Sequence, residues 1–453
     1  MTSQDDMQAK LALARQSAQR RTGRSTLSAR GDGDGGWPAA QRFEDLADYR
    51  TIEKMRMVGS VLDVVNPFFR RHEGHAKATT VIDGNSVINF ASYDYAGLNA
   101  DIRTANAAKA AIDSYGVSPS GSRLVAGERP VHGALEAGLA QLYGVPAAMC
   151  FVSGHSTNVS TLGYLMTEGD LILYDSLVHN SIQVGMKLSG AARRAFAHND
   201  LAALETLLIE NRSRFRNALI VVEGLYSMDG DTPPLADLIA LKHRYGCWLM
   251  VDDAHALGCV GATGKGSFEA CGIDPRDVDI WMGTLSKTLA STGGYIAGSQ
   301  ALIDVLRGHA SGFVFSVALA PALAASALCA LQILMAEPDR VQQLQANCAL
   351  FLQLAAAAGL DTGTAGAYSI VPVMVGDSLL AAKLSERLLA RGINALPVMF
   401  PAVPMQGARL RFFLSSLHSA DQIEAAVTAT AQELQILRDS GFGTAVPAQL
   451  LNL

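Results

Sequence analysis

Short apolar runs alternate with longer helix-like segments through the middle of the chain, between about residues 135 and 298. Apolar runs of this length are typical of strands that are buried on both faces, and the helix-like segments suit the crossovers between them. The pattern therefore predicts an α/β fold with a mostly parallel sheet that helices cover on both faces. The strand-like runs are Ala147 to Val152, Leu171 to Tyr174, Ala218 to Val222, Trp248 to Val251 and Ile280 to Met282.

The pattern changes on either side of this central part. Alternating apolar residues from Val81 to Phe90 predict a strand or hairpin, and residues 102–115 have helical periodicity. After Glu337 a long helical pattern leads into an α+β part, with strand-like residues 370–375 and 410–414 and a last helix at about residues 419–438. We therefore predict an N-terminal extension and linker (1–46), an N-terminal arm (47–100), a large domain (101–337) and a C-terminal small domain (338–453).

Composition places the chain among ordinary soluble globular proteins. It has 453 residues, of which 49% are hydrophobic and 17% charged, enough to bury a large core. The net charge of −6 and the scattered Lys and Arg residues give no electrostatic reason to expect nucleic acid. The six cysteines form no CxxC pair, which fits a reducing, cytoplasmic location. No apolar run reaches the ~20 residues of a membrane span, and no signal peptide is expected.

Two sequence features match metal motifs only in part. The Asp-Gly alternation at residues 31–36 lacks the bidentate Glu that ends a calcium loop, so it reads as a flexible linker after a polar, helix-compatible segment. His72 and His75 flank Glu73, but the helical zinc motif needs two residues between the Glu and the second His. We therefore expect no metal site.

Reactive side chains follow three of the predicted strands. Glu223 to Ser227 come after one strand, Asp252 to His255 after the next, and Thr284 to Lys287 after the third. Ligands of open α/β sheets lie at the carboxyl ends of the strands, so these side chains are expected to meet at one edge. They include a lysine, carboxylates, an imidazole and hydroxyls, which pyridoxal 5'-phosphate (PLP) requires for its Schiff base, ring nitrogen and phosphate.

A fourth strand end adds a candidate phosphate site. The strand-like residues up to Val152 lead into Ser153, Gly154 and His155 and then into a helical pattern. A glycine at a helix start lets the backbone approach a phosphate that the free amides of the first turn bind. Alone this would be an ordinary tight turn, but it fits the cofactor that the other three strand ends indicate.

Together these motifs resemble the α-oxoamine synthases, enzymes of PLP fold type I. The resemblance runs from about residue 90 to residue 418. It implies an aspartate aminotransferase-like large domain and a smaller α+β C-terminal domain. It also implies a PLP-dependent acyltransferase that condenses an amino acid with an acyl thioester and releases carbon dioxide. The stretches that carry it are Phe90 to Leu98, Gly121 to Gly127, Tyr174 to Ser181, Glu223 to Asp231, Asp252 to His255, Gly283 to Lys287, Gly293 to Tyr295 and Ala408 to Arg411.

The resemblance implies roles around the cofactor ring. Lys287 would form the Schiff base and later move the substrate proton, and Asp252 would pair with the pyridine nitrogen. His179 would stack on the ring, and His255 would hydrogen-bond its phenolic oxygen, with Ser227 nearby. The expected catalytic residues are thus Lys287, His179, Asp252 and His255.

The resemblance also implies how the phosphate is held. Ser153, Gly154, His155 and Thr284 would bind it. His155 stands where the family often has an aromatic residue, so its backbone is the expected contact and the role of its side chain stays open. In this family a hydroxyl from the neighbouring subunit completes the phosphate site. Here that points to Ser316 and to a homodimer.

Further site residues follow from the same resemblance. Arg411 would bind the carboxylate of the amino acid, and Tyr93 and Arg70 are further expected substrate contacts. Asn158 and Glu223 are expected cofactor contacts. The role of Glu223 stays open between a structural one and the tuning of neighbouring hydroxyls.

Departures from the family pattern bear on the substrate. Tyr93 stands where several members have Asn, and Ala402 where the oxononanoate synthases have Thr, and both look more like serine palmitoyltransferase than 5-aminolevulinate synthase. Val317 and Ala318 remove polar groups near the acyl path, where each buried methylene stabilises binding by about 0.8 kcal/mol. We therefore expect a medium or long acyl thioester, with serine or alanine favoured over glycine.

Two alternatives remain open at this point. CoA or an acyl carrier protein could carry the acyl group, and the Arg residues of segment 1–46 would suit an acidic carrier protein. An aminotransferase or lyase of the same fold would retain Lys287 and Asp252 without needing a thioester site.

Overall fold

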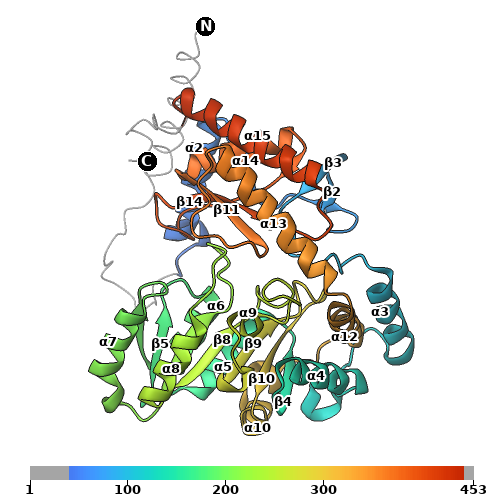
Figure 1. Cartoon of the computed structure of the whole chain (residues 1–453), viewed down its shortest axis with the longest axis vertical. Coiled ribbons are helices and arrows are strands. Elements are labelled where there is room, and N and C mark those ends of the chain that lie inside the picture. The colour runs from blue at the N-terminus through green and yellow to red at the C-terminus, as the bar shows by residue number, and fades with distance from the viewer. Residues whose placement is uncertain (1–39, 443–453) are drawn as a thin grey trace, which may run out of the picture.

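The computed structural model describes residues 40–442. The predicted N-terminal helix and the linker at residues 31–36 lie outside the described residues. The chain forms a large unit around a seven-stranded sheet and a smaller unit above it in the view, where segments from both ends of the chain meet (Figure 1).

The large sheet has the strand order β4-β10-β9-β8-β7-β5-β6. Strands β5 to β9 pair in parallel, whereas β10 runs antiparallel between β4 and β9. The prediction of a mostly parallel sheet is therefore confirmed. The strands are β4 (Ala147–Phe151), β5 (Leu171–Asp175), β6 (Ala192–Phe196), β7 (Ala218–Glu223), β8 (Trp248–Asp252), β9 (Ile280–Thr284) and β10 (Gly294–Gly298).

Helices cover both faces of this sheet. Neighbouring residues of a strand point to opposite faces, so Ile220 of β7 belongs to one hydrophobic cluster and Val221 to the other. The first cluster includes residues of α4, α7, α8 and α12, and the second includes residues of α5, α6 and α10. The helices are α3 (Ile102–Tyr115), α4 (Pro130–Tyr143), α5 (Gly154–Leu165), α6 (Asn180–Ser189), α7 (Leu201–Asn211), α8 (Leu235–Tyr245), α9 (Ser267–Cys271), α10 (Gln300–His309), α11 (Ser311–Val314) and α12 (Pro321–Ala336).

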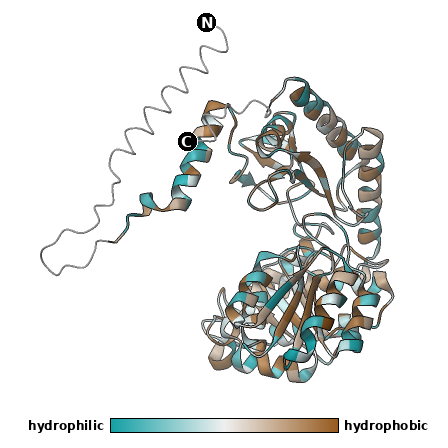
Figure 2. Cartoon of the chain, turned by 90° about the vertical axis from the view of Figure 1, so that its left-hand side faces the viewer, coloured by the Kyte–Doolittle hydropathy of each residue, from teal (hydrophilic) through white to brown (hydrophobic). Residues whose placement is uncertain are grey.

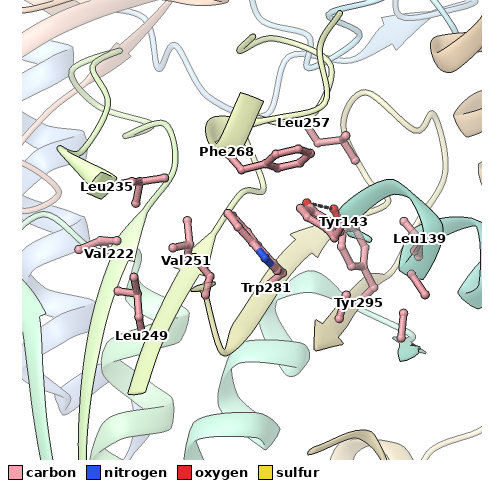
Figure 3. Close-up of a cluster of buried hydrophobic side chains, with 14 of the residues drawn as sticks. Leu139, Tyr143, Val222, Leu235, Leu249, Val251, Leu257, Phe268, Trp281 and Tyr295 are labelled. Atoms are coloured by element: carbon pink, nitrogen blue, oxygen red, sulfur yellow. Dashed lines mark hydrogen bonds between the residues drawn. The ribbon is translucent and has the colours of Figure 1, made fainter. Parts of the chain in front are cut away.

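Aromatic side chains fill the first cluster near the strand ends (Figure 3). Trp281 stacks on Tyr143 with ring centroids 4.9 Å apart, and Phe268 meets Trp281 edge-on. The hydroxyls of Tyr143 and Tyr295 lie 2.9 Å apart and form a hydrogen bond. Because a buried hydroxyl without a partner is unfavourable, this pairing allows two tyrosines to occupy an apolar core.

The smaller unit joins segments from both ends of the chain. It holds the antiparallel sheet β11-β14-β13 and the sheet β1-β2-β3-β12, in which β12 pairs in parallel with β3. The strand or hairpin predicted at residues 81–90 is a hairpin, formed by β2 and β3, which begins two residues earlier at Thr79. The elements are α2 (Ala47–Val61), β1 (His72–Glu73), β2 (Thr79–Ile82), β3 (Asn85–Asn89), α13 (Asp339–Ala357), β11 (Ile370–Gly376), α14 (Ser378–Ala390), β12 (Ile393–Asn394), β13 (Leu396–Val398), β14 (Ala408–Phe413) and α15 (Ala420–Asp439), with short turns of helix at Phe43–Asp45, Arg123–Gly127, Arg212–Arg214 and Pro275–Asp277.

Helix α2 stands apart from the two units, and none of its residues is buried (Figure 2). No single helix within residues 40–442 is long and apolar enough to cross a membrane, and α12 and α13 reach that length and composition only together, across a bend of 78°. Over the same residues no group of three His, Cys, Asp or Glu side chains is placed to hold a metal ion. All six cysteines are free.

Candidate active site

Neighbouring parallel strands bring the predicted reactive residues to one edge of the large sheet. Strand β7 ends at Glu223 and β8 at Asp252, and these two buried residues are paired across the strands. Strand β9 ends at Thr284, just before Lys287 in the chain. The structure therefore brings two carboxylates and a lysine together at the carboxyl ends of the strands.

Lys287 is the lysine of this edge. Burial of its amino group lowers the pKa of Lys287 to about 8, although the negative charge of Asp252 opposes the shift. Its Nζ lies 5.6 Å from the ring centroid of Tyr93. Because a lysine with this pKa keeps an appreciable uncharged fraction near neutral pH, Lys287 is suited to act as a nucleophile.

A chain of hydrogen bonds connects Asp252 with His179. Asn158 donates through Nδ2 to Oδ2 of Asp252 (2.8 Å) and to Oγ of Ser181 (2.9 Å). Oγ of Ser181 lies 2.7 Å from Nδ1 of His179, and the Ser181 amide also donates to this Nδ1. Since Nδ1 accepts, the neutral imidazole carries its proton on Nε2. Ser181 belongs to the stretch Tyr174 to Ser181 that carries the family resemblance, but nothing in the sequence indicates that it joins these two groups.

His255 has a partner that the sequence did not indicate. Its Nδ1 lies 2.8 Å from the hydroxyl of the buried Tyr95. Burial, with the charges of Lys287 and Arg411, lowers the pKa of His255 well below its usual range, so the ring is neutral. With Tyr95 as the donor, Nδ1 accepts and Nε2 carries the proton, which leaves an N–H group for a second acceptor.

Glycines form a tight cradle at the N-terminus of α5. A Cβ atom on Gly154 would lie 2.8 Å from Oγ1 of Thr284, and one on Gly294 would lie 2.7 Å from Cα of Gly154. No ordinary side chain fits at either position without displacing its neighbours. The first turn of α5 therefore presents bare backbone at the edge of the sheet.

The predicted phosphate hydroxyls already have partners within the chain. Ser153 caps α5 by accepting a hydrogen bond from an amide of its first turn, and Thr284 donates to the carbonyl of Gly293 (2.9 Å). The first amides of a helix have no acceptor inside it. Gly154 and His155 are the first residues of α5, so their amides are the donors best suited to an anion.

Strand β14 supplies two arginines that reach the loop after β7. Arg409 donates to Oδ1 of Asp229 (2.6 Å), and Arg411 donates through Nη1 to the carbonyl of Ser227 (2.9 Å). The Nε of Arg411 is buried and has no hydrogen-bond partner within residues 40–442. An unpaired buried N–H group is unfavourable, and a bound substrate carboxylate would give the Nε–H of Arg411 an acceptor.

A cleft of about 330 Å³ opens beside Lys287. Its wall includes Tyr93, which is 40% exposed. Polar side chains of the N-terminal arm and of the loop after β9 line much of the rest. These are His72, Asn89, Ser92, Asp94, Asn99, Ser286 and Ser291.

Two of the predicted site residues lie elsewhere. Arg70 donates to Oδ1 of Asn394 (2.7 Å) and to Oγ of Ser385 (3.2 Å), so its side chain contacts β12 and α14 and does not line the cleft. Ser316 lies after α11, between the exposed Phe315 and Val317. The structure of one chain places neither residue beside Lys287.

Comparison with known proteins identifies the family. Residues 85–429 match the model of the aminotransferase class I and II family. The chain is 42% identical to an 8-amino-7-oxononanoate synthase of Methylobacterium nodulans, over 79% of this chain and 89% of that protein. The 8-amino-7-oxononanoate synthase 1 of Bacillus subtilis is 36% identical over 79% and 92%. The solved serine palmitoyltransferase of Sphingomonas wittichii superposes with a TM-score of 0.83 and 29% identity, over 88% of this chain and 99% of that one.

The chain belongs to the class I and II aminotransferase family, as an α-oxoamine synthase. It is therefore a PLP-dependent acyltransferase that catalyses a decarboxylative condensation. The residues of this α-oxoamine synthase fit the cofactor. The glycine cradle at α5 leaves room for a phosphate beside free backbone amides, Asp252 provides a buried carboxylate for the ring nitrogen, and Lys287 provides an amine of lowered pKa.

Proposed function

We propose that this enzyme condenses serine or alanine with a medium or long acyl thioester, releasing carbon dioxide, a free thiol and an α-amino ketone. The observation that carries the proposal is that the Nε of Arg411 is buried and has no hydrogen-bond partner in the described chain. The positive charge of the Arg411 guanidinium also contributes to the lowered pKa of Lys287, so the two side chains face the same site. An amino-acid carboxylate bound by Arg411 would hold its α-carbon near Lys287.

The names of the relatives support small amino acids. The name serine palmitoyltransferase gives serine as the amino acid of that enzyme. The compound 8-amino-7-oxononanoate has a methyl group on its amino carbon, which alanine would supply. Both names also describe acyl chains longer than succinyl. We therefore propose the same substrate classes for this chain.

The residues of the chain have complementary tasks in this reaction. PLP, when bound, draws electrons from the α-carbon of the amino acid, so that the α-proton and later the carboxylate can leave. Asp252 would keep the ring nitrogen protonated, and Asn158 fixes the orientation of its carboxylate. Lys287 would take the α-proton and later return one, which its pKa of about 8 suits. The Nε2–H of His255 would donate to the phenolic oxygen.

We also propose that the working unit is a homodimer in which Ser316 of one subunit completes the phosphate site of the other. Two hydrophobic residues beside it are exposed in the single chain, Phe315 at 86% and Val317 at 53%. Helix α2 also buries none of its residues within the chain. Exposed apolar groups of this kind are typical of contact surfaces between proteins.

A substrate matrix tests the proposal. Glycine, alanine and serine are each combined with succinyl-, octanoyl- and palmitoyl-CoA and with the same acyl groups on an acyl carrier protein. Thiol release, carbon dioxide release and product mass are measured. We expect alanine or serine with an acyl group longer than succinyl, and one carbon dioxide for each thiol. A preference for glycine and succinyl-CoA would contradict the substrate proposal.

A further inference from the structure

A histidine outside the cofactor site connects two loops that serve this site. His198 follows β6 and places Nδ1 3.0 Å from Oδ1 of Asp175 and Nε2 2.9 Å from Oδ2 of Asp231. Asp175 is the fully buried last residue of β5, and Asp231 belongs to the loop after β7. One imidazole therefore bridges carboxylates that come from the ends of two neighbouring strands.

The geometry favours a charged imidazole. Each ring nitrogen faces a carboxylate oxygen, so a neutral ring would direct a lone pair at one of the two carboxylates. Burial alone would lower the pKa of His198, but the hydrogen bonds to Asp175 and Asp231 outweigh it and raise the pKa to about 10. Both contacts are therefore charge-assisted hydrogen bonds at neutral pH.

Asp175 also fixes the loop that carries His179. Its Oδ1 accepts a hydrogen bond from the amide of Leu177 (2.8 Å), and its Oδ2 accepts one from the amide of Asn199 (2.9 Å). At the end of the same loop, the amide of His179 donates to Oε1 of Glu223 (2.5 Å). Loop 175–179 is thus held at its start by Asp175 and at its end by Glu223.

Asp231 closes the loop that contacts Arg411. The amide of Tyr226 donates to the carbonyl of Asp231 (2.9 Å), and the amide of Gly230 donates to the carbonyl of Tyr226 (2.9 Å). Within this closed loop, the carbonyl of Ser227 accepts the hydrogen bond from Nη1 of Arg411 (2.9 Å). A displacement of Asp231 would therefore change the position of the carbonyl that orients the Arg411 guanidinium.

We infer that His198 is a positioning residue that holds loops 175–179 and 226–231 together and thereby keeps His179 over the cofactor ring and orients Arg411 toward the bound amino acid. The inference rests on the proposed roles of His179 and Arg411. No hydrogen bond of His198 involves Lys287 or Asp252 in the described part of the chain. Loss of the bridge should therefore weaken amino-acid binding more than cofactor binding.

The variant His198→Gln tests the inference in the PLP-loaded enzyme. A glutamine side chain has one N–H-bearing end and cannot donate to both carboxylates in this geometry. PLP content is measured from the absorbance of the bound cofactor, and the Kd for alanine or serine from the absorbance change on titration. We expect PLP content to fall much less than amino-acid affinity, and the Kd and KM for the amino acid to rise roughly tenfold, with a smaller fall in kcat.

Two further variants make the result specific. His243→Gln changes a histidine at the end of α8 whose side chain is 60% exposed and 3.9 Å from Asp277, and it should leave PLP content, Kd, KM and kcat unchanged. Asp231→Asn removes the negative charge from the other end of the same bridge but keeps an acceptor oxygen, so it should raise the Kd in the same direction by a smaller factor. The double variant of His198 and Asp231 should lose less than the sum of the two single effects, because both remove one interaction.

Several outcomes would overturn the inference. One is an unchanged amino-acid Kd in both His198→Gln and Asp231→Asn. Another is an equal loss of PLP and amino-acid binding, because that would mark a general structural role. If His198→Gln does not fold, Asp231→Asn decides the question. The titration does not require turnover, so an enzyme that binds the amino acid but forms no amino ketone would contradict the proposed function and still test the bridge.

Discussion

The charge of the residues around Lys287 depends on their neighbours. Burial and the negative charge of Asp252 raise the pKa of Glu223 well above its usual range, which favours a proton on Glu223 near neutral pH. That proton removes one of two like charges at adjacent strand ends. The amide of His179 still has Glu223 as its acceptor, so the structural contact of Glu223 does not require its charge.

The pKa of Lys287 sets how fast the enzyme without cofactor takes up PLP. Only the uncharged amine attacks the aldehyde, so the uptake rate should rise with pH and level off above about pH 8. Stopped-flow absorbance between pH 6.5 and 9.5 measures this rate. Lys287→Ala should form no covalent adduct and show no turnover, whereas Lys187→Ala, which changes an exposed lysine of α6, should behave like the parent. A rate that rises tenfold for each pH unit up to pH 9.5 would contradict the lowered pKa.

Replacing Asp252 should separate cofactor binding from catalysis. Asp252→Asn keeps the size of the side chain but removes the negative charge that we propose lies beside the ring nitrogen. We expect PLP to stay bound and kcat to fall by about 10² or more, because an electrostatic contribution to the transition state is lost. Steady-state thiol release gives kcat, and the absorbance of bound PLP gives the cofactor content. Asp277→Asn, at a side chain that is 47% exposed, is the control, and normal turnover of Asp252→Asn would contradict its role.

At the scale of elements, the strands that the sequence revealed are those buried on both faces. Strands β5, β7 and β8 are apolar runs because helices cover each side of them. Strands β6 and β10 are not evident from the pattern of apolar residues. In β6 the arginines Arg193 and Arg194 are exposed at the edge of the sheet, so the strand has no apolar run. In β10 glycines stand at both ends of a five-residue strand, which resembles a loop in the sequence.

Residues of the site were likewise predictable from the sequence only where they stand near the end of an apolar run. Asp252 follows its apolar run directly and Lys287 lies three residues after the end of β9, so the positions of the strand ends made both of them candidates. Tyr95 contacts His255 across 160 residues of sequence, and a buried tyrosine in a motif looks like any core aromatic residue. Arg70 was expected at the substrate, but its hydrogen bonds with Asn394 and Ser385 depend on tertiary packing that one sequence does not show.

The N-terminus of α5 is the element on which phosphate binding should depend. Gly154→Ala adds a Cβ atom 2.8 Å from Oγ1 of Thr284, so the helix start or the loop after β9 must move. We expect the Kd for PLP to rise at least roughly tenfold, because overpacking at such a contact costs about 1–3 kcal/mol. Fluorescence or absorbance titration measures it. Gly133→Ala in α4, where a Cβ atom meets nothing within 4 Å, should leave the Kd unchanged.

At the scale of the whole molecule, the proposed dimer should be necessary for full PLP binding. Phe315→Asp places a charge on the exposed residue beside Ser316. If this surface is buried between subunits, the dimer Kd should rise at least ~100-fold and PLP occupancy should fall with it. Sedimentation velocity and cofactor absorbance measure both. The control is Ile436→Asp, which changes a residue of α15 that is 47% exposed. An unchanged dimer Kd in Phe315→Asp would contradict this interface.

The pairing of β3 with β12 has a consequence for the synthesis of the chain. Asn89 and Asn394 hydrogen-bond across 305 residues of sequence, so β3 leaves the ribosome long before its partner is translated. The strands of the large sheet lie between them in the chain and can therefore pair with one another before residue 394 is made. Until residue 394 emerges, β3 presents an open strand edge, which is prone to pair with other chains. A truncated chain that ends before residue 394 should therefore aggregate. In the full-length chain, β12 pairs with β3 and covers that edge.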